Sequence, residues 1–226
     1  VVLTAGVLMF LGLQHWRQRA TAAVARRGIY ENCLPLIESA QIEQHGAQFP
    51  SLEGRYQGKR IRLDAIVDSA SVRKLPSVWL QLNVVEPLPI AITLDLLVRP
   101  LNTEFFSPSS ELPVRLDVPS GWPEHAIIKA SGEGAKHLLP QVDALVRNVF
   151  ADLKCKELLL TPKGLRLVYQ LAQAERADYL VLRAMVFDQA RVPQELLSRF
   201  MDQLVQLHDE LCAGRPITAA AAPNQA

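Results

Sequence analysis

Acidic residues are absent from the first thirty positions, where the only charged side chains are Arg17, Arg19, Arg26 and Arg27. The 226-residue chain has 24 Lys and Arg against 23 Asp and Glu, so without those four arginines 20 basic residues face 23 acidic ones. A mildly acidic body lacks the clustered positive charge that exchanges for counterions on a nucleic acid. We therefore expect no nucleic-acid partner.

Cysteine and histidine are also scarce, and their spacing predicts neither a disulfide framework nor a metal or cofactor site. Cys33, Cys155 and Cys212 lie far apart and form no CxxC pair. The five histidines form no HxH or HxxxH pair, which disfavours a zinc site. The GxG at Gly132-Glu133-Gly134 lacks the rest of a nucleotide-binding fingerprint, so we expect only a turn there.

The chain begins with an uncharged apolar run, VVLTAGVLMFLGL. Thirteen residues rise only about 20 Å as a helix, whereas a bilayer core is about 30 Å thick, so we expect a transmembrane helix whose beginning is missing. The flank suits a membrane interface, and its expected interface residues are Trp16, Arg17, Arg19, Arg26 and Arg27. A buried helix and a cleaved signal peptide are the alternatives, although a signal peptide places its positive charges before the run.

Positions 1–27 are therefore interpreted as a single-pass anchor with a juxtamembrane helix that breaks at Gly28, and the lipid bilayer is the first expected partner. The excess of arginine after the apolar run predicts that the C-terminal body lies on the cytoplasmic side of the membrane.

The segment 28–99 is expected to hold a short helix near 35–44 and then an antiparallel β-meander with one face toward water. Alternation places Ile61, Leu63, Ala65 and Val67 on one face, and Gln57-Gly58 suits a hairpin turn. The next strands are expected in SVWLQLNVV, with Leu80 among its inward residues, and in IAITLDLLVRP.

Five prolines mark 100–124 as an irregular connection that carries three aromatic side chains. We expect these aromatics to be exposed and to bind a protein partner, since aromatic and arginine anchors dominate many interfaces. The expected interaction residues are Phe105, Phe106 and Trp122, with Arg73 and Lys74 of the basic loop SVRKLP as a second group.

The segment 125–214 is expected to form a second, layered α/β unit. Its pattern predicts a strand at 126–129, a helix at about 138–150, strands at 157–160, 165–171 and 179–187, and a helix from Pro193 to Gly214. The tail 215–226 has no core-forming pattern and is expected to be loose. The whole chain is predicted to be an α+β protein.

These features favour a membrane-anchored accessory, assembly or scaffold protein whose body docks on a larger membrane complex. One alternative is a membrane-bound, hydrolase-like enzyme that uses Cys155 or His125; Lys154 and Lys156 beside Cys155 would lower its thiol pKa. Another is a lipid-handling domain with an apolar groove on the inner face of the meander. No catalytic residue is assigned, because no cysteine or histidine has a partner at a diagnostic spacing.

Overall fold

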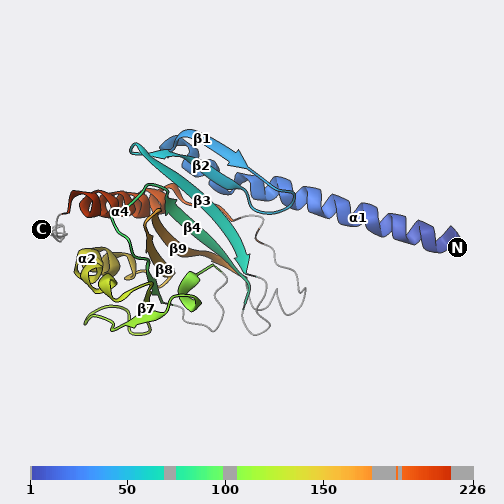
Figure 1. Cartoon of the computed structure of the whole chain (residues 1–226). Coiled ribbons are helices and arrows are strands. Elements are labelled where there is room, and N and C mark those ends of the chain that lie inside the picture. The colour runs from blue at the N-terminus through green and yellow to red at the C-terminus, as the bar shows by residue number, and fades with distance from the viewer. Residues whose placement is uncertain (1, 69–74, 99–105, 175–186, 188–189, 215–226) are drawn as a thin grey trace, which may run out of the picture.

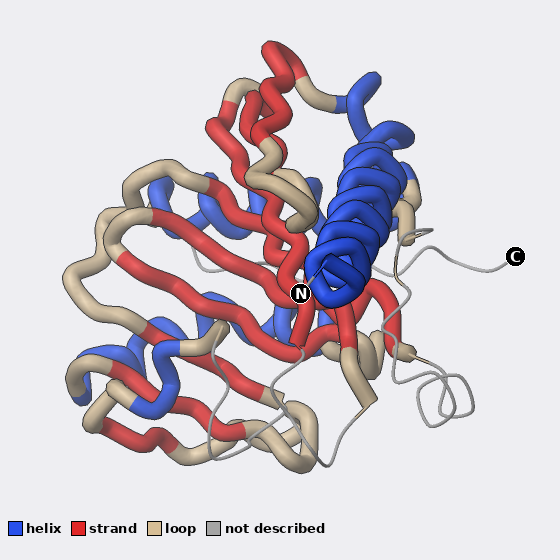
Figure 2. Tube along the Cα trace, turned by 90° about the vertical axis from the view of Figure 1, so that its right-hand side faces the viewer, coloured by secondary structure: helices blue, strands red, loops and turns tan. Residues whose placement is uncertain are grey.

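The computed structural model describes residues 2–68, 75–98, 106–174, 187 and 190–214, and it shows an α+β fold built on one antiparallel sheet. The nine strands lie in the order β1-β2-β3-β4-β9-β8-β5-β7-β6. Figure 2, turned so that the N-terminal end of α1 faces the reader, shows the strands side by side.

The helices and strands occupy the following ranges. The first half of the chain holds α1 (Val2–Arg27), the 3-10 helix η1 (Gly28–Leu36), β1 (Glu38–Glu43), β2 (Ser51–Tyr56), β3 (Lys59–Asp68), β4 (Ser77–Val84), β5 (Leu94–Leu97), η2 (Pro108–Ser110) and β6 (Val114–Leu116). The second half holds β7 (Ile127–Ala130), η3 (Glu133–Leu138), α2 (Leu139–Val149), β8 (Cys155–Thr161), β9 (Gly164–Gln173) and α4 (Gln194–Ala213).

Helix α1 extends away from the body, and only its C-terminal end joins the rest of the protein (Figure 1). Gln44 donates from Nε2 to the Ala23 carbonyl at 2.9 Å, and Arg26 donates from Nη1 to the Ala47 carbonyl at 2.7 Å. In the part of the chain that the structure describes, no helix combines the length and the hydropathy needed to span a membrane.

The inner face of the sheet is covered by helices, and the main core lies between them. The alternating apolar residues of the strands point to this face, including Leu63, Leu80 and Leu167, none of which is accessible to solvent. Helix α4 packs there with an apolar stripe that includes Phe200, whose ring centroid lies 5.3 Å from that of Tyr169. The expected inward orientation of Leu80 is therefore confirmed.

The expected helix at 35–44 is wrong. Residues 28–36 form the 3-10 helix η1, which contains Pro35, and residues 38–43 form the edge strand β1. Gly54 in β2 permits this arrangement, since a Cβ atom there would lie 2.4 Å from Cγ2 of Ile37 and 2.9 Å from the Glu38 carbonyl. Ladder hydrogen bonds with β2 therefore replace the helical ones that the sequence pattern suggested.

The meander is confirmed from β2 to β4, but the expected neighbour of β4 is wrong. The β8–β9 hairpin lies between β4 and β5, so the strands expected in two separate parts of the chain belong to one sheet. The register of β4 with β9 continues from Val84↔Leu165 to Ser77↔Gln173. The apolar faces of β8 and β9 lie over the same helices as β4, which sequence alternation alone does not reveal.

The C-terminal elements follow the expected pattern closely. Helix α2 carries Pro140 in its first turn, where proline is tolerated, and α4 follows Pro193 and ends at Gly214 in a left-handed conformation. The expected strand at 179–187 lies outside the described residues except for Phe187, which is buried. The tail 215–226 also lies outside them.

Candidate functional site

A row of mostly polar residues crosses the outer face of the sheet, which is the face opposite the helices. Neighbouring strands pair these residues one after another, so the row runs through all nine strands. From β1 to β6 it contains Gln41, Glu53, Arg62, Asn83, Arg166, Leu159, Asp95, Lys129 and Arg115. Eight of these nine side chains are polar or charged, so this line across the outer face is polar over nearly its whole length.

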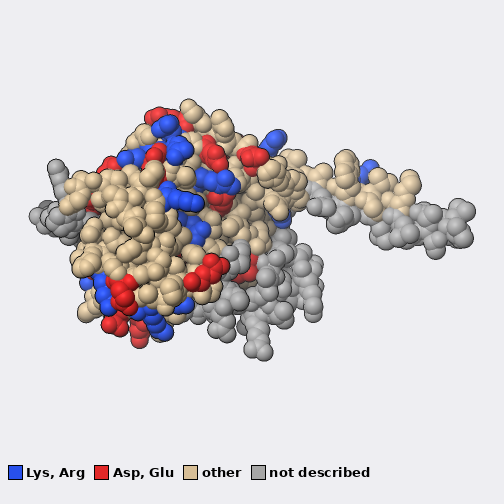
Figure 3. Space-filling view, in the orientation of Figure 1, with Lys and Arg blue, Asp and Glu red and all other residues tan. Residues whose placement is uncertain are grey.

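The row is exposed at its β1 end, buried in the middle, and exposed again at Arg115 on β6. Gln41, Glu53 and Arg62 on β1–β3 are exposed, whereas Leu159 and Asp95 on β8 and β5 are buried. Figure 3 shows lysine and arginine side chains gathered in a band on this face, with acidic side chains beside them. The exposed part over β1–β4 is therefore the candidate site, and we call it the outer patch.

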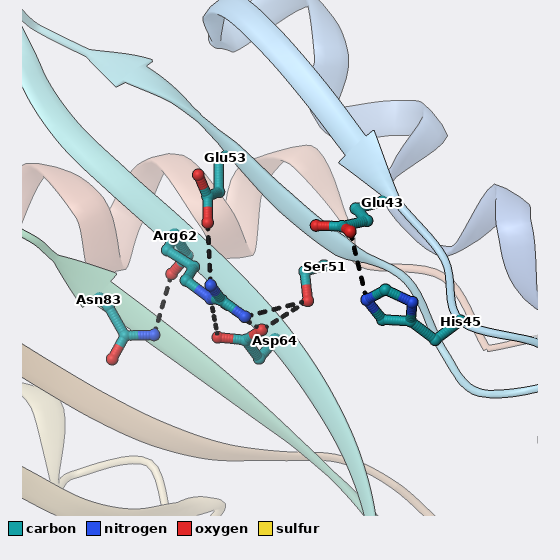
Figure 4. A network of polar contacts seen from close by, with 7 residues as sticks. All are labelled: Glu43, His45, Ser51, Glu53, Arg62, Asp64 and Asn83. Atoms are coloured by element: carbon teal, nitrogen blue, oxygen red, sulfur yellow. Dashed lines mark hydrogen bonds and ion pairs between the residues drawn. The ribbon is translucent and has the colours of Figure 1, made fainter.

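Arg62 is the centre of the polar network in the outer patch (Figure 4). Its guanidinium contacts Glu53 Oε1 at 2.9 Å and Asp64 Oδ2 at 2.9 Å. Ser51 donates to Asp64 Oδ1 at 2.7 Å, and Asn83 donates to the Arg62 carbonyl at 3.0 Å. The hydrogen bond to Asp64, together with the charges of Asp64 and Glu53, raises the pKa of Arg62. The contacts with both carboxylates hold the Arg62 side chain against the strands.

A hollow of about 350 Å³ lies beside this network. It is lined by Ser39, Gln41, Glu53, Gly54, Arg55, Arg60, Ile61, Arg62 and Val85. Arg60 contacts Glu86 Oε1 at 3.4 Å from Nε, and the Arg60 backbone N–H donates to the same oxygen at 3.0 Å, which lowers the pKa of Glu86. Arg55 donates to the Gly58 carbonyl at 2.8 Å.

A second hollow, of about 240 Å³, adjoins the first and shares Val85 with it. Its lining includes Asn83, Thr161, Lys163 and Arg166 from β4 and from the β8–β9 hairpin. Gly164 is required in this hairpin, since its φ is +145° and a Cβ atom there would meet the Val84 carbonyl oxygen.

Two carboxylates lie at the buried middle of the row, Asp95 within it and Glu157 beside it on β8. Arg166 pairs with Glu157 through Nε to Oε2 at 3.0 Å and Nη2 to Oε1 at 3.4 Å, and Ser107 donates to Asp95 Oδ2 at 3.0 Å. Burial raises the pKa of Asp95 to about 6. Burial and the nearby Asp95 carboxylate raise the pKa of Glu157 to about 7, and the attraction of Arg166 opposes this shift.

Phe106 is buried, so its expected exposure is wrong. Its side chain is 5% exposed and packs with Trp79, Leu97 and Val168 in a small cluster on the outer face. The ring centroids of Phe106 and Trp79 are 5.4 Å apart. Together with the hydrogen bond from Ser107 to Asp95, this cluster holds the segment that contains η2 against the sheet, over the buried middle of the row.

Trp122 is also buried, against the same expectation. It is 7% exposed, and its Nε1 donates to Asp143 Oδ1 at 2.7 Å. Asp143 also pairs with Arg147, which donates from Nη2 to the Ser120 carbonyl at 2.7 Å, so these contacts fix the proline-rich segment to α2. The other expected interaction residues, Phe105, Arg73 and Lys74, lie outside the described residues.

The expected membrane-interface residues lie along α1. Trp16 and Arg17 are exposed on the projecting part of the helix, and Arg27 is exposed at its end. Arg26 instead turns toward the body, where its guanidinium lies 5.2 Å from the centroid of the Phe49 ring. Arg19 is part of the same helix, but its side chain lies outside the described part of the structure.

The geometry around Cys155 and His125 does not form a catalytic pair. Cys155 is 1% exposed, and burial raises its thiol pKa well above the usual value, which reverses the lowering expected from Lys154 and Lys156. His125 is exposed on a different segment. Among the described residues, no three His, Cys, Asp or Glu side chains lie close enough together to hold a metal ion.

Helices cover most of the inner face of the sheet, where the apolar groove for a lipid was expected. A hollow of about 380 Å³ lies near the end of α1 and reaches Ala65 and Val67, which belong to the inner face of β3. It is lined by Arg26, Gln48, Phe49, Ala65, Ile66, Val67 and Phe187.

Comparison with known proteins shows no family for this chain. No protein-family model matches it, and no curated protein matches it either. One solved structure that resembles it is the crystal structure of the mycobacterial trehalose monomycolate transport factor A, TtfA, with a TM-score of 0.40 and 8% sequence identity. The match covers 90% of this chain and 97% of that chain. At this TM-score the likeness carries no argument about function.

The residues of the outer patch were not predicted from the sequence as a site. Alternation in β3 does place Arg60, Arg62 and Asp64 on the face away from the core, which is the available signal. The partners of these residues on β2 and β4, such as Glu53 and Asn83, depend on the strand register and therefore emerge only from the fold.

Proposed function

We propose that the protein is an accessory protein of a membrane complex, in which α1 enters the bilayer as a single membrane helix and the outer patch of the body docks a protein partner. The observation that carries this proposal is the exposure of the apolar part of α1. Met9 is 71% exposed, Phe10 59% and Trp16 68%, on a helix that extends away from the body.

A lipid bilayer is the surface that fits this helix. Burying an apolar side chain of this size away from water contributes about 1.5–3 kcal/mol, so a row of such side chains favours an apolar environment strongly. Trp16 and Arg17 follow the uncharged run, as residues of a membrane interface do. Arg17, Arg19, Arg26 and Arg27 then support a body on the cytoplasmic side, because positive flanks are retained there.

The outer patch supports the docking part of the proposal. Its exposed charges are held in fixed positions by Arg62 and its partners, whereas the helix-covered face is closed by the core. Fixed polar groups on a rigid sheet lose little side-chain entropy when a partner binds, which favours recognition.

Fractionation of cells that produce the full chain tests the membrane part. The wild-type protein should sediment with membranes and resist carbonate extraction. Phe10→Asp should move most of the protein to the soluble fraction, because a charge at the centre of an inserted helix costs about 2.5–3.5 kcal/mol. Recovery of wild-type protein in the carbonate extract would contradict insertion.

Val24→Asp is the matched control. Val24 is also an exposed apolar residue of α1, at 75%, but it lies near the body, between Arg19 and Arg26. This variant should stay with the membranes. Equal release of both variants would show that a charge acts on the whole helix and not on a membrane-inserted part.

A further inference from the structure

We propose that the two adjoining hollows of the outer face form one basic groove that binds an extended acidic segment of a partner protein. This inference rests on the proposed docking function and names the chemistry of the partner. It is carried by the charges that line the groove, by a pair of opposed arginines and by the length of the groove.

The charge of the groove differs from that of the body around it. Five basic residues line the two hollows, namely Arg55, Arg60, Arg62, Lys163 and Arg166, whereas one acidic residue, Glu53, is among the lining residues of the first hollow. Arg62 and Arg166 have carboxylate partners at 2.9 and 3.0 Å. In the described part of the chain, neither Arg55 nor Lys163 forms an ion pair, so both offer charge to a ligand.

Arg55 and Arg60 lie directly opposite each other on β2 and β3. Like charges at opposed positions of an antiparallel pair are destabilising. The tight turn fixes this register, since Gln57 and Gly58 both have positive φ, 49° and 78°, as a two-residue hairpin turn of this kind requires. Glu86 forms a direct contact with Arg60, and its single carboxylate also attracts Arg55, so one negative charge faces two arginines. A bound carboxylate would relieve the repulsion that the fold imposes.

The length of the groove suits a peptide. Its lining residues come from β1, β2, β3, β4, β9 and β8, which are consecutive in the sheet. Neighbouring strands lie about 4.8 Å apart, so five spacings give about 24 Å. An extended chain covers this distance with about seven residues. A single phosphate group would contact only part of the groove.

The position of the groove favours a protein over a lipid surface. The end of α1 contacts Gln44 and Ala47, which follow the C-terminal end of β1. Arg55 and Arg60 lie at the opposite ends of these strands, beside the β2–β3 turn, and Figure 1 shows that turn on the far side of the body from the free end of α1. A membrane that holds α1 would therefore leave the groove accessible from the aqueous side.

Fluorescence anisotropy with a labelled peptide tests the inference. The probe is a peptide of about ten glutamates, long enough to fill the groove, and the control probe is a glutamine peptide of the same length. The full chain, kept in a mild neutral detergent, should bind the glutamate peptide and not the glutamine peptide. Binding should weaken as the ionic strength rises, because exposed charges are screened by salt.

Charge-removing variants locate the site. Arg55→Gln combined with Arg60→Gln should weaken binding about tenfold, the size expected for two exposed ion pairs. Lys163→Gln should weaken it by about threefold. Arg115→Gln is the matched control, because Arg115 is an exposed arginine of the same row but lies on the far edge strand β6. This variant should leave peptide binding unchanged. The melting temperature of the double variant should not fall, since the substitutions remove the repulsion between Arg55 and Arg60.

Three results would overturn the inference. One is the absence of glutamate-peptide binding, and another is an equal loss of binding in Arg115→Gln. The third is binding of phosphatidylglycerol vesicles or inorganic phosphate that depends on Arg55 and Arg60 when the peptide does not bind, which would assign the groove to a phosphate group. Because the peptide assay contains no membrane, its results leave the role of α1 to be judged separately by fractionation.

Discussion

Replacing Phe106 with alanine should destabilise the protein, although the residue lies in a proline-rich connection. Its ring is 5% exposed and packs with Trp79, Leu97 and Val168. Buried Phe→Ala changes cost about 3–5 kcal/mol, and the tilted contact with Trp79 accounts for about 0.5–1.5 kcal/mol of such a loss. Since this cluster is small and lies on the outer face, we expect about 3 kcal/mol.

Thermal unfolding followed by circular dichroism measures this effect. For a chain of this size, 1 kcal/mol shifts the melting temperature by about 2–4 °C, so Phe106→Ala should lower it by about 6–12 °C. Val118→Ala is the control, because Val118 is 39% exposed and its truncation should change stability by less than about 0.5 kcal/mol. An unchanged melting temperature for Phe106→Ala would mean that the ring is exposed and that the segment does not cover the sheet.

Two further predictions concern the two faces of the sheet. Leu80→Asp should lower the free energy of unfolding by several kcal/mol and prevent cooperative unfolding, since an unpaired charge would enter the main core. Asn83→Asp on the outer face should be tolerated, because Arg62 and Arg166 lie opposite it on the neighbouring strands. Thermal unfolding followed by circular dichroism distinguishes the two variants. The raised pKa values of Asp95 and Glu157, about 6 and about 7, mean that the folded protein holds protons that the unfolded chain releases. Their contribution to stability is therefore present below the ordinary carboxyl pKa and is lost as pH rises to about 7, by an amount on the order of 1–3 kcal/mol. Asp95→Asn should make stability less dependent on pH and should raise the melting temperature near neutral pH. A lower melting temperature of this variant at every pH would contradict this prediction.

The sequence predicts the local elements well where one face of an element is apolar. Alternation identifies β3 and β4 and the inward position of Leu80, and helical spacing identifies α2 and α4. The helix expected at 35–44 fails because β1 is an edge strand with six exposed residues and therefore carries no alternation. The insertion of β8 and β9 beside β4 depends on long-range pairing, which local periodicity does not encode.

The site was less predictable than the fold for a related reason. Aromatic residues in an irregular segment suggested exposed anchors, but Phe106 and Trp122 contact the sheet and α2, and these contacts bury them. In the sequence, the charged residues of the outer patch look like those of any solvent-exposed strand face. Only the strand register, which sets Arg55 opposite Arg60, distinguishes this face from an ordinary solvated one.

An environment-sensitive fluorophore tests directly whether α1 contacts the bilayer while the outer patch remains free. The label is attached to a cysteine introduced by Phe10→Cys, Val24→Cys or Arg62→Cys in a Cys212→Ser background, because Cys212 is the exposed one of the three cysteines. On addition of vesicles, the emission at position 10 should shift to the blue and become protected from iodide, whereas positions 24 and 62 should not change. A blue shift at position 62 without one at position 10 would contradict insertion of α1, because the sheet would then be the membrane-binding surface.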